Sequence, residues 1–115
     1  MSDKHHRGRA ALRVQASVFA ALGDETRLFV LEKLSRGEPQ SISRLTAGSR
    51  LTRQAVTKHL RVLESAGVVR SVRTGRESLF ALEPRRLEEA RDFLDGVARE
   101  WEGALARLKA FLEET

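Results

Sequence analysis

Residues 52–67 read TRQAVTKHLRVLESAG, and this stretch predicts an amphipathic helix with defined ends. The hydroxyl of Thr52 can cap the free amide groups at a helix start. Gly67 tolerates the left-handed backbone that often ends a helix. Apolar side chains recur at helical spacing: Val56, Leu60 and Leu63, with Ala55, Val62 and Ala66 beside them. The stretch therefore has one face built to pack against a core.

The opposite face of this helix is basic and rich in long donors: Arg53, Gln54, Thr57, Lys58 and Arg61. The one acidic residue of this stretch, Glu64, lies near the end of the helix. Such a face suits the major groove of DNA, where Arg and Lys reach guanine edges or phosphates, Gln pairs with adenine and the Thr methyl contacts thymine. The alternative is an ordinary surface helix with a solvated basic face, and a short motif does not decide between the two.

The composition limits the classes of function that this chain can have. The chain has 115 residues, the length of about one domain. Its net charge of +5 favours an anionic partner. Cysteine is absent, which excludes disulfides and thiolate metal ligands. Because no secretory signal and no membrane-length apolar run are visible, we expect a soluble, cytoplasmic protein without a membrane partner.

The charge is distributed unevenly. Residues 1–82 hold fifteen bases and seven acids, whereas residues 83–115 hold six bases and nine acids. The basic excess therefore belongs to the first two-thirds of the chain, and the final third has a different role.

The N-terminal region is predicted as two parts. Residues 1–9 lack apolar periodicity and are interpreted as a flexible basic arm. His5 and His6, with Asp3 nearby, form a weak candidate for a metal site. Residues 10–22, AALRVQASVFAAL, predict a short helix, with Leu12, Ala16, Phe19 and Leu22 on one side and Gly23 as its stop.

Two further helices lead to the 52–66 helix. The first is expected over 25–36, capped by Asp24, with a strongly apolar set: Leu28, Phe29, Val30, Leu31 and Leu34. The second is expected over 41–47, capped by Ser41, and is followed by Gly48-Ser49-Arg50. Two helices joined by a turn of this length, the second one basic, predict a helix-turn-helix.

A hairpin is predicted after Gly67. Residues 68–73 and 77–82 are short β-type segments separated by Thr74-Gly75-Arg76. Arg73 and Arg76 flank Gly75, where nothing bulky blocks approach to a sugar-phosphate backbone. We interpret residues 70–80 as the wing of a winged helix, because a purely structural hairpin would not predict bases clustered at its tip.

A long helix is predicted over 85–113, after Pro84. Its apolar residues alternate at steps of three and four, the spacing of a helix–helix seam: Leu87, Ala90, Leu94, Val97, Trp101, Ala104, Leu108 and Phe111. The helix is too long for a core of this size to cover, so we expect it to pair with the same helix of a second chain, with the first helix available to join. The alternative is a helix folded back on its own domain.

Three segments together resemble the ArsR-type winged helix-turn-helix regulators. They are FAALGDETRLFVLEKL, RQAVTKHLRVLESAGVV and TGRESLFAL, within residues 18–83. FLDGVAREWEGALARLKAFLEE resembles the tail of a branch that binds no metal. The resemblance implies a homodimeric repressor that leaves its operator when an effector binds. This branch often has His at the position of His59. We interpret His59 as a packing residue or as a contact to phosphate.

Two departures from the ArsR pattern matter. Metal-sensing members carry a Cys pair in the third helix or carboxylates and His on the last one, whereas this chain has SISRLTAG and a last helix without His. We therefore expect no metal and no cofactor, and the effector is not predicted. The family also commonly has Gly where this chain has Arg50. A positive φ at that position would cost about 1 kcal/mol.

The sequence as a whole predicts a mostly α fold with a small β-hairpin. It has an arm (1–9), a winged helix-turn-helix core (10–83) and a C-terminal dimerisation helix (84–115). The expected partner is double-stranded operator DNA, contacted by Arg50, Arg53, Gln54, Thr57, Lys58, Arg61, Arg73 and Arg76. The expected dimer contacts are Leu87, Leu94, Val97, Trp101, Ala104 and Leu108. Two alternatives remain: a winged-helix protein-interaction module, and a metal-responsive repressor that uses the N-terminal histidines. No catalytic constellation is visible, so an enzyme is not expected.

Overall fold

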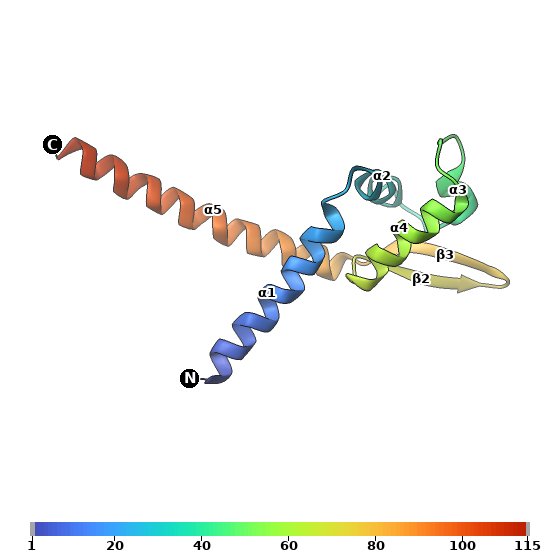
Figure 1. Cartoon of the computed structure of the whole chain (residues 1–115), viewed down its shortest axis with the longest axis horizontal. Coiled ribbons are helices and arrows are strands. Elements are labelled where there is room, and N and C mark those ends of the chain that lie inside the picture. Colours follow the sequence, from blue (N-terminus) through green and yellow to red (C-terminus); the bar gives the residue numbers. More distant parts are fainter. Residues whose placement is uncertain (1, 115) are drawn as a thin grey trace.

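The computed structural model describes the backbone of residues 2–114 and the side chains of residues 8–114. Its elements, in chain order, are α1 (Ser2–Leu22), α2 (Glu25–Leu34), β1 (Gln40–Ser41), α3 (Ile42–Thr46), α4 (Arg53–Ser65), β2 (Val69–Thr74), β3 (Glu77–Leu82) and α5 (Pro84–Glu113) (Figure 1). The predicted fold class, a mostly helical winged helix-turn-helix with a long last helix, is confirmed. No helix within the described residues is both long enough and apolar enough to cross a membrane.

The three predicted helix caps are formed. The side chains of Asp24, Ser41 and Thr52 each accept a hydrogen bond from a backbone N–H three residues further on, at 3.0, 3.2 and 3.0 Å. These bonds satisfy amides that a helix start leaves unpaired. Local sequence therefore sets where α2, α3 and α4 begin, and with them the position of the helix-turn-helix.

The core lies where α1, α2, α3 and α4 meet the sheet. Eight side chains are fully buried there: Val18, Val30, Leu34, Leu45, Val56, Leu60, Leu63 and Val68. The inward stripe predicted for α4 is confirmed at Val56, Leu60 and Leu63. Val62 does not follow the prediction, because 39% of its surface is exposed on the side of α4 that faces α1.

The sheet has one strand more than expected. β3 lies between β2 and the two-residue strand β1, and both pairings are antiparallel. Gln40 pairs with Phe80 and Ser41 with Leu79, which ties the start of α3 to the base of the wing. At the other end of the hairpin, Gly75 has a φ of 62° and closes the turn between β2 and β3.

Helix α2 buries only part of its apolar surface. Val30, Leu31 and Leu34 are in the core, whereas Leu28 and Phe29 are 51% and 42% exposed. Helix α2 therefore contributes to the core through three of its five apolar residues, whereas Leu28 and Phe29 stay at the surface. A helix packed on one side buries a stripe about three to four residues wide per two turns, and these two side chains lie outside that stripe.

Helix α1 begins at Ser2, eight residues before the predicted start at residue 10. Residues 2–9 are thus helical in backbone, and the interpretation of residues 1–9 as a flexible basic arm stays a prediction. No proline interrupts them, and Gly8 costs a helix only about 1 kcal/mol. Leu12, expected to pack, is 55% exposed. The side chains of the candidate metal site at Asp3, His5 and His6 lie outside the described ones.

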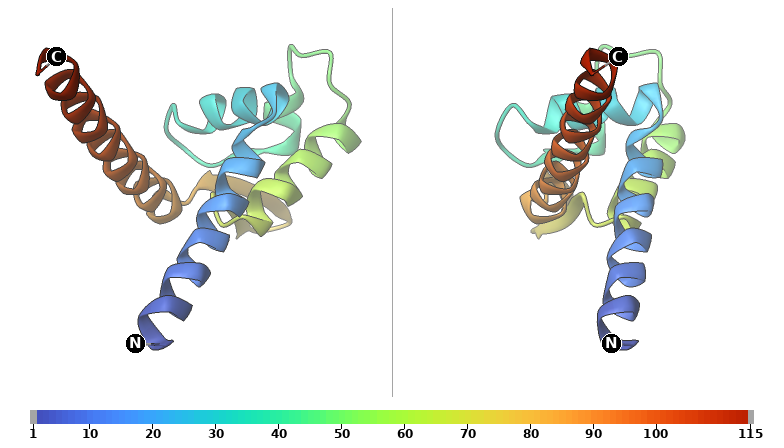
Figure 2. Two further views of the ribbon diagram at one scale, coloured as in Figure 1. Left: turned by 60° about the vertical axis from the view of Figure 1, so that its left-hand side comes forward. Right: turned by 90° about the vertical axis from the view of Figure 1, so that its left-hand side faces the viewer.

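Helix α5 leaves the core after its first turns. Leu87 packs against the core, Ala90 is 4% exposed and the Phe93 ring lies 6.0 Å from that of Phe19 on α1. Beyond this point α5 runs away from the rest of the chain (Figures 1 and 2). The molecule measures 67 × 36 × 22 Å, and its radius of gyration is 19.1 Å, against about 13 Å for a compact chain of this length. The alternative of a folded-back helix is therefore wrong beyond residue 93.

Candidate DNA-binding surface

The outward face of α4 gathers five of the predicted contact residues. Arg53, Gln54, Lys58 and Arg61 are exposed and Thr57 is half-buried. The guanidinium groups of Arg53 and Arg61 and the ammonium group of Lys58 make no hydrogen bond or ion pair with another described residue. Three cations on one helix face are thus free to meet an anionic partner.

The acid of this helix, Glu64, is occupied elsewhere. The hydroxyl of Ser71 on β2 donates a 2.6 Å hydrogen bond to Glu64 Oε2. The carboxylate thereby joins the last turn of α4 to the wing. This contact orients the wing relative to α4, and it keeps the one negative charge of α4 bonded to the wing.

Arg50 lies in the loop before α4 and is exposed. Its φ is not positive, and the left-handed residue of this turn is Gly48, with φ of 72°. The strain considered for a non-glycine residue at position 50 is therefore absent. Because the loop takes its unusual backbone at Gly48, Arg50 can project a cation beside the start of α4 without conformational cost.

The wing carries the two remaining predicted contacts. Arg73 pairs with Ser78 across the hairpin, Arg76 follows Gly75 in the turn, and both arginines are exposed. The wing extends toward the same end of the molecule as the amino-terminal end of α4 (Figure 1). The structure therefore places the bases of the wing tip and the basic face of α4 so that one extended anionic surface can meet both.

Arg27 holds α4 against the preceding helices, and sequence reasoning did not single it out. Its Nε donates to the carbonyl of Ala21 at 2.6 Å and one amino group donates to that of Ala20 at 3.3 Å. Its other amino group lies 3.4 Å from His59 Nδ1 on α4. The sequence signal for this role was an arginine one turn after the capping residue Asp24. Only the fold shows that the Arg27 side chain reaches the end of α1.

His59 is part of the same cluster. It is half-buried, and its Nδ1 lies 3.9 Å from Asp24 Oδ2. Of the two interpretations of His59, packing agrees with this position. The hydrogen bond from the Arg27 backbone N–H, followed by the positive charge of Arg27, holds the pKa of Asp24 below its ordinary value. Within the described side chains, no three His, Asp or Glu residues gather as a metal site would require.

The chain is similar to known regulators over most of its length. Residues 22–72 match a family model described as a helix-turn-helix domain. The uncharacterized HTH-type transcriptional regulator YuzN of Bacillus subtilis is 42% identical, over 59% of this chain and 83% of that protein. The HTH-type transcriptional regulator Rv2034 of Mycobacterium tuberculosis is 35% identical, over 74% of this chain and 76% of its own length.

A solved structure decides the family. An ArsR-like transcriptional regulator from Rhodococcus sp. RHA1 is 38% identical and superimposes with a TM-score of 0.80, over 89% of this chain and 95% of that one. This chain belongs to the ArsR family. It is accordingly a DNA-binding transcriptional regulator of the winged helix-turn-helix type.

A second structure is informative about assembly in this ArsR family. It is the solution structure of a homodimeric winged helix-turn-helix DNA-binding domain from Mycobacterium bovis, a possible ArsR-family regulator. That domain is 25% identical, with a TM-score of 0.65, over 82% of this chain and 86% of its own.

Proposed function

We propose that this ArsR regulator is a homodimeric repressor that binds a pseudo-palindromic operator through residues 52–66 and the wing, residues 70–80. The observation that carries the proposal is the set of unpaired cations on the outward face of α4, beside a wing whose tip bears Arg73 and Arg76. Since the chain is a DNA-binding regulator by family, this is the surface with the charge and shape to enter a major groove.

The contact residues divide into three groups by position. Gln54 and Thr57 lie on the face of α4 that enters the groove, where they contact base edges. Arg53, Lys58 and Arg61 border them and reach guanines or phosphates. Arg50 in the loop before α4, Arg73 near the end of β2 and Arg76 in the wing turn contact phosphates, which position the protein without specifying sequence.

A second copy of the chain would cover the seam on α5. Leu94, Trp101 and Leu108 are 52%, 64% and 54% exposed in the single chain. An apolar stripe of this length, on a helix of about 45 Å, suits pairing with an identical helix through Leu94, Val97, Trp101, Ala104 and Leu108. The homodimeric Mycobacterium bovis domain supports the same assembly.

This arrangement assigns roles to the parts of the chain. Residues 10–83 form the DNA-binding core and residues 84–115 serve dimerisation. The first turns of α5, through Leu87 and Ala90, also pack with the core and so fix the direction of the dimer helix. Two recognition surfaces related by a dyad then match half-sites about 34 Å apart, one helical turn of DNA.

The test is binding to the DNA upstream of the regulator's own gene. Fluorescence anisotropy should show tighter binding to this fragment than to a shuffled sequence of the same length, with an affinity that falls steeply as salt rises. Footprinting should show two protected half-sites, and a reporter fused to the fragment should be silenced by the protein. Equal, weak binding to both DNAs would contradict the proposal of a specific operator. Activation of the reporter would contradict the proposal that the protein is a repressor.

A further inference from the structure

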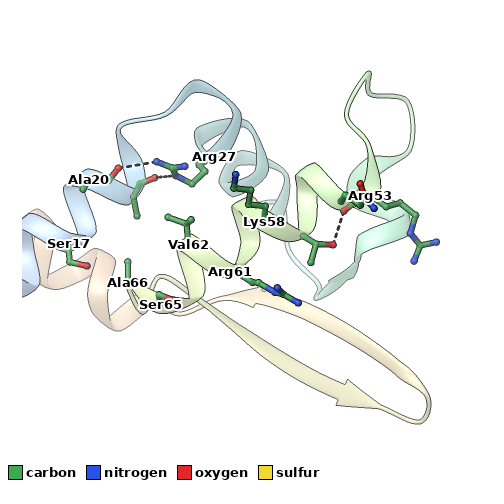
Figure 3. A pocket seen from close by; sticks show the side chains of 12 residues that line it. Ser17, Ala20, Arg27, Arg53, Lys58, Arg61, Val62, Ser65 and Ala66 are labelled. Carbon is green, nitrogen blue, oxygen red and sulfur yellow. Dashed lines mark hydrogen bonds between the residues drawn. The ribbon is translucent and has the colours of Figure 1, made fainter.

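A groove of about 910 Å³ lies between α1 and α4 (Figure 3). Its volume is within the range of about 300–1,000 Å³ found for small-molecule sites. The groove exists because the facing side chains are small. Ser17, Ala20 and Ala21 line it from α1, and Ser65 and Ala66 line it from α4. These residues are too short to fill the space between the two helices.

The floor of this groove is apolar. Val62, with 39% of its surface exposed, lines it together with Ala20, Ala21 and Ala66. In Figure 3, Val62 lies between Ala66 and Lys58, with Ala20 and Ser17 across the groove. A half-exposed valine beside alanines favours a hydrocarbon over water as its neighbour.

The rim of the groove is cationic. Arg27, Lys58 and Arg61 line it, and its lining, all of it within the described residues, contains no Asp or Glu. Arg27 is held in place by the carbonyls of Ala20 and Ala21, whereas Lys58 and Arg61 have no partner among the described residues. Free cations at the edge of an apolar floor complement a molecule with an anionic head and a hydrocarbon body.

We propose that the α1–α4 groove binds an amphipathic organic anion, a carboxylate with an apolar body, and that this molecule is an effector. Its carboxylate pairs with Lys58 and Arg61, and its hydrocarbon covers Val62, Ala20 and Ala66. Inorganic phosphate fits less well, because it leaves the apolar floor exposed. The regulatory half of the proposal rests on the proposed DNA contacts, because the groove and the DNA-binding face of α4 share five residues for which the two ligands compete: Arg53, Gln54, Thr57, Lys58 and Arg61.

Octanoate is a suitable probe, measured by titration calorimetry on the purified full-length protein without DNA. We expect saturable binding to the wild type and none of octylammonium. Ala20→Leu fills the floor and Lys58→Ala removes a rim cation. Each should weaken octanoate binding about tenfold or more, while Ala11→Leu, an exposed position on α1 outside the groove, leaves it unchanged. Circular dichroism and thermal unfolding confirm that the variants are folded.

Several results would overturn the proposal: no saturable octanoate binding, equal binding by Ala20→Leu and the wild type, or equal binding of octanoate, octanol and octylammonium. DNA binding is measured separately, without octanoate. If the protein does not bind DNA, the proposed function is contradicted, whereas ligand binding in the groove is still decided by calorimetry. If both ligands bind, octanoate should displace the upstream DNA fragment from the wild type and not from Ala20→Leu. Binding of both together would overturn the effector role.

Discussion

The hydroxyl of Thr57 is bonded to its own helix. Its Oγ1 donates a 2.7 Å hydrogen bond to the carbonyl of Arg53, one turn earlier, a bond drawn as a dashed line in Figure 3. Since the hydroxyl proton is used inside α4, the hydroxyl has no proton to donate to a DNA base, and we expect the methyl group to be the part of Thr57 that contacts one. A thymine methyl is the base feature that such a group contacts.

Two substitutions can separate the role of the Thr57 hydroxyl from that of its methyl group. Thr57→Val keeps a methyl group at the DNA surface, so its sequence preference should stay close to that of the wild type. Thr57→Ser keeps the hydroxyl and removes the methyl, so discrimination at one operator position should fall by about 1 kcal/mol or more. Competition binding against single-base operator variants measures both. A wild-type preference in Thr57→Ser would assign that position to another residue.

The wing arginines should contribute affinity without specificity. Arg73→Ala and Arg76→Ala should each weaken binding to upstream and random DNA alike, and each should lower the slope of log K against log salt by about one unit. Titrations at several salt concentrations measure the slope. Arg99→Ala, which removes an exposed arginine from α5, is the matched control and should leave the slope unchanged. A loss confined to the specific fragment would mean that the wing contacts bases.

The seam of α5 should hold the dimer together. Leu94→Asp or Leu108→Asp places a carboxylate in an apolar interface, which costs several kcal/mol when no partner neutralises it. The cost arises only in the dimer, because both leucines are more than half exposed in the single chain. Sedimentation should therefore show a folded monomer with weak DNA binding.

The matched control for the seam is Ala106→Asp, which adds the same charge at an exposed position opposite the seam. It should remain dimeric and bind DNA normally. Dimers that persist in Leu94→Asp and Leu108→Asp would place the interface elsewhere on the chain, and α1 would be the next surface to test.

Arg27 should stabilise the fold more than a surface arginine does. Arg27→Ala leaves the carbonyl of Ala21 without its side-chain donor, leaves that of Ala20 with the Gly23 N–H alone and detaches His59, at a cost of about 1–2 kcal/mol. Urea unfolding measures this difference. Arg9→Ala, which removes an exposed arginine of α1, should change stability by less than about 0.5 kcal/mol. Equal effects of the two substitutions would show that the Arg27 cluster is only a surface contact.

Asp24 should make stability fall in acid. Its pKa is lowered in the folded protein, chiefly by the hydrogen bond from the Arg27 N–H, so it binds a proton less readily when folded than when unfolded. Its stabilisation is therefore present above the unfolded value of about 3.8–3.9 and is lost as the pH falls through the lowered pKa. Asp24→Asn keeps a cap acceptor without the charge. Its urea midpoint should fall less than that of the wild type between about pH 6 and pH 3, and parallel curves would contradict this.

Local chemistry in the sequence was sufficient for the order of the five helices and of the two wing strands. Thr52, Ser41 and Asp24 are capping residues whose partners lie three positions away, and Gly75 closes a two-strand turn, so each signal and its target fall within a few residues. The inward stripe of α4 and the regular seam of α5 follow from helical period in the same way. For the same reason, the basic face of α4 was visible before any tertiary structure.

Tertiary structure decided the features that depend on packing between distant segments. Leu28, Phe29 and Val62 are apolar residues whose burial depends on which neighbour covers them, and composition does not specify that neighbour. The two-residue strand β1 exists only because β3 offers it an edge, and Arg27 matters only because α1 ends beside α2 and α4. The α1–α4 groove is the clearest case, because it forms where the side chains of two helices are too small to fill the space between them. Ala21 on α1 and Arg61 on α4, which both line it, are forty residues apart in the chain.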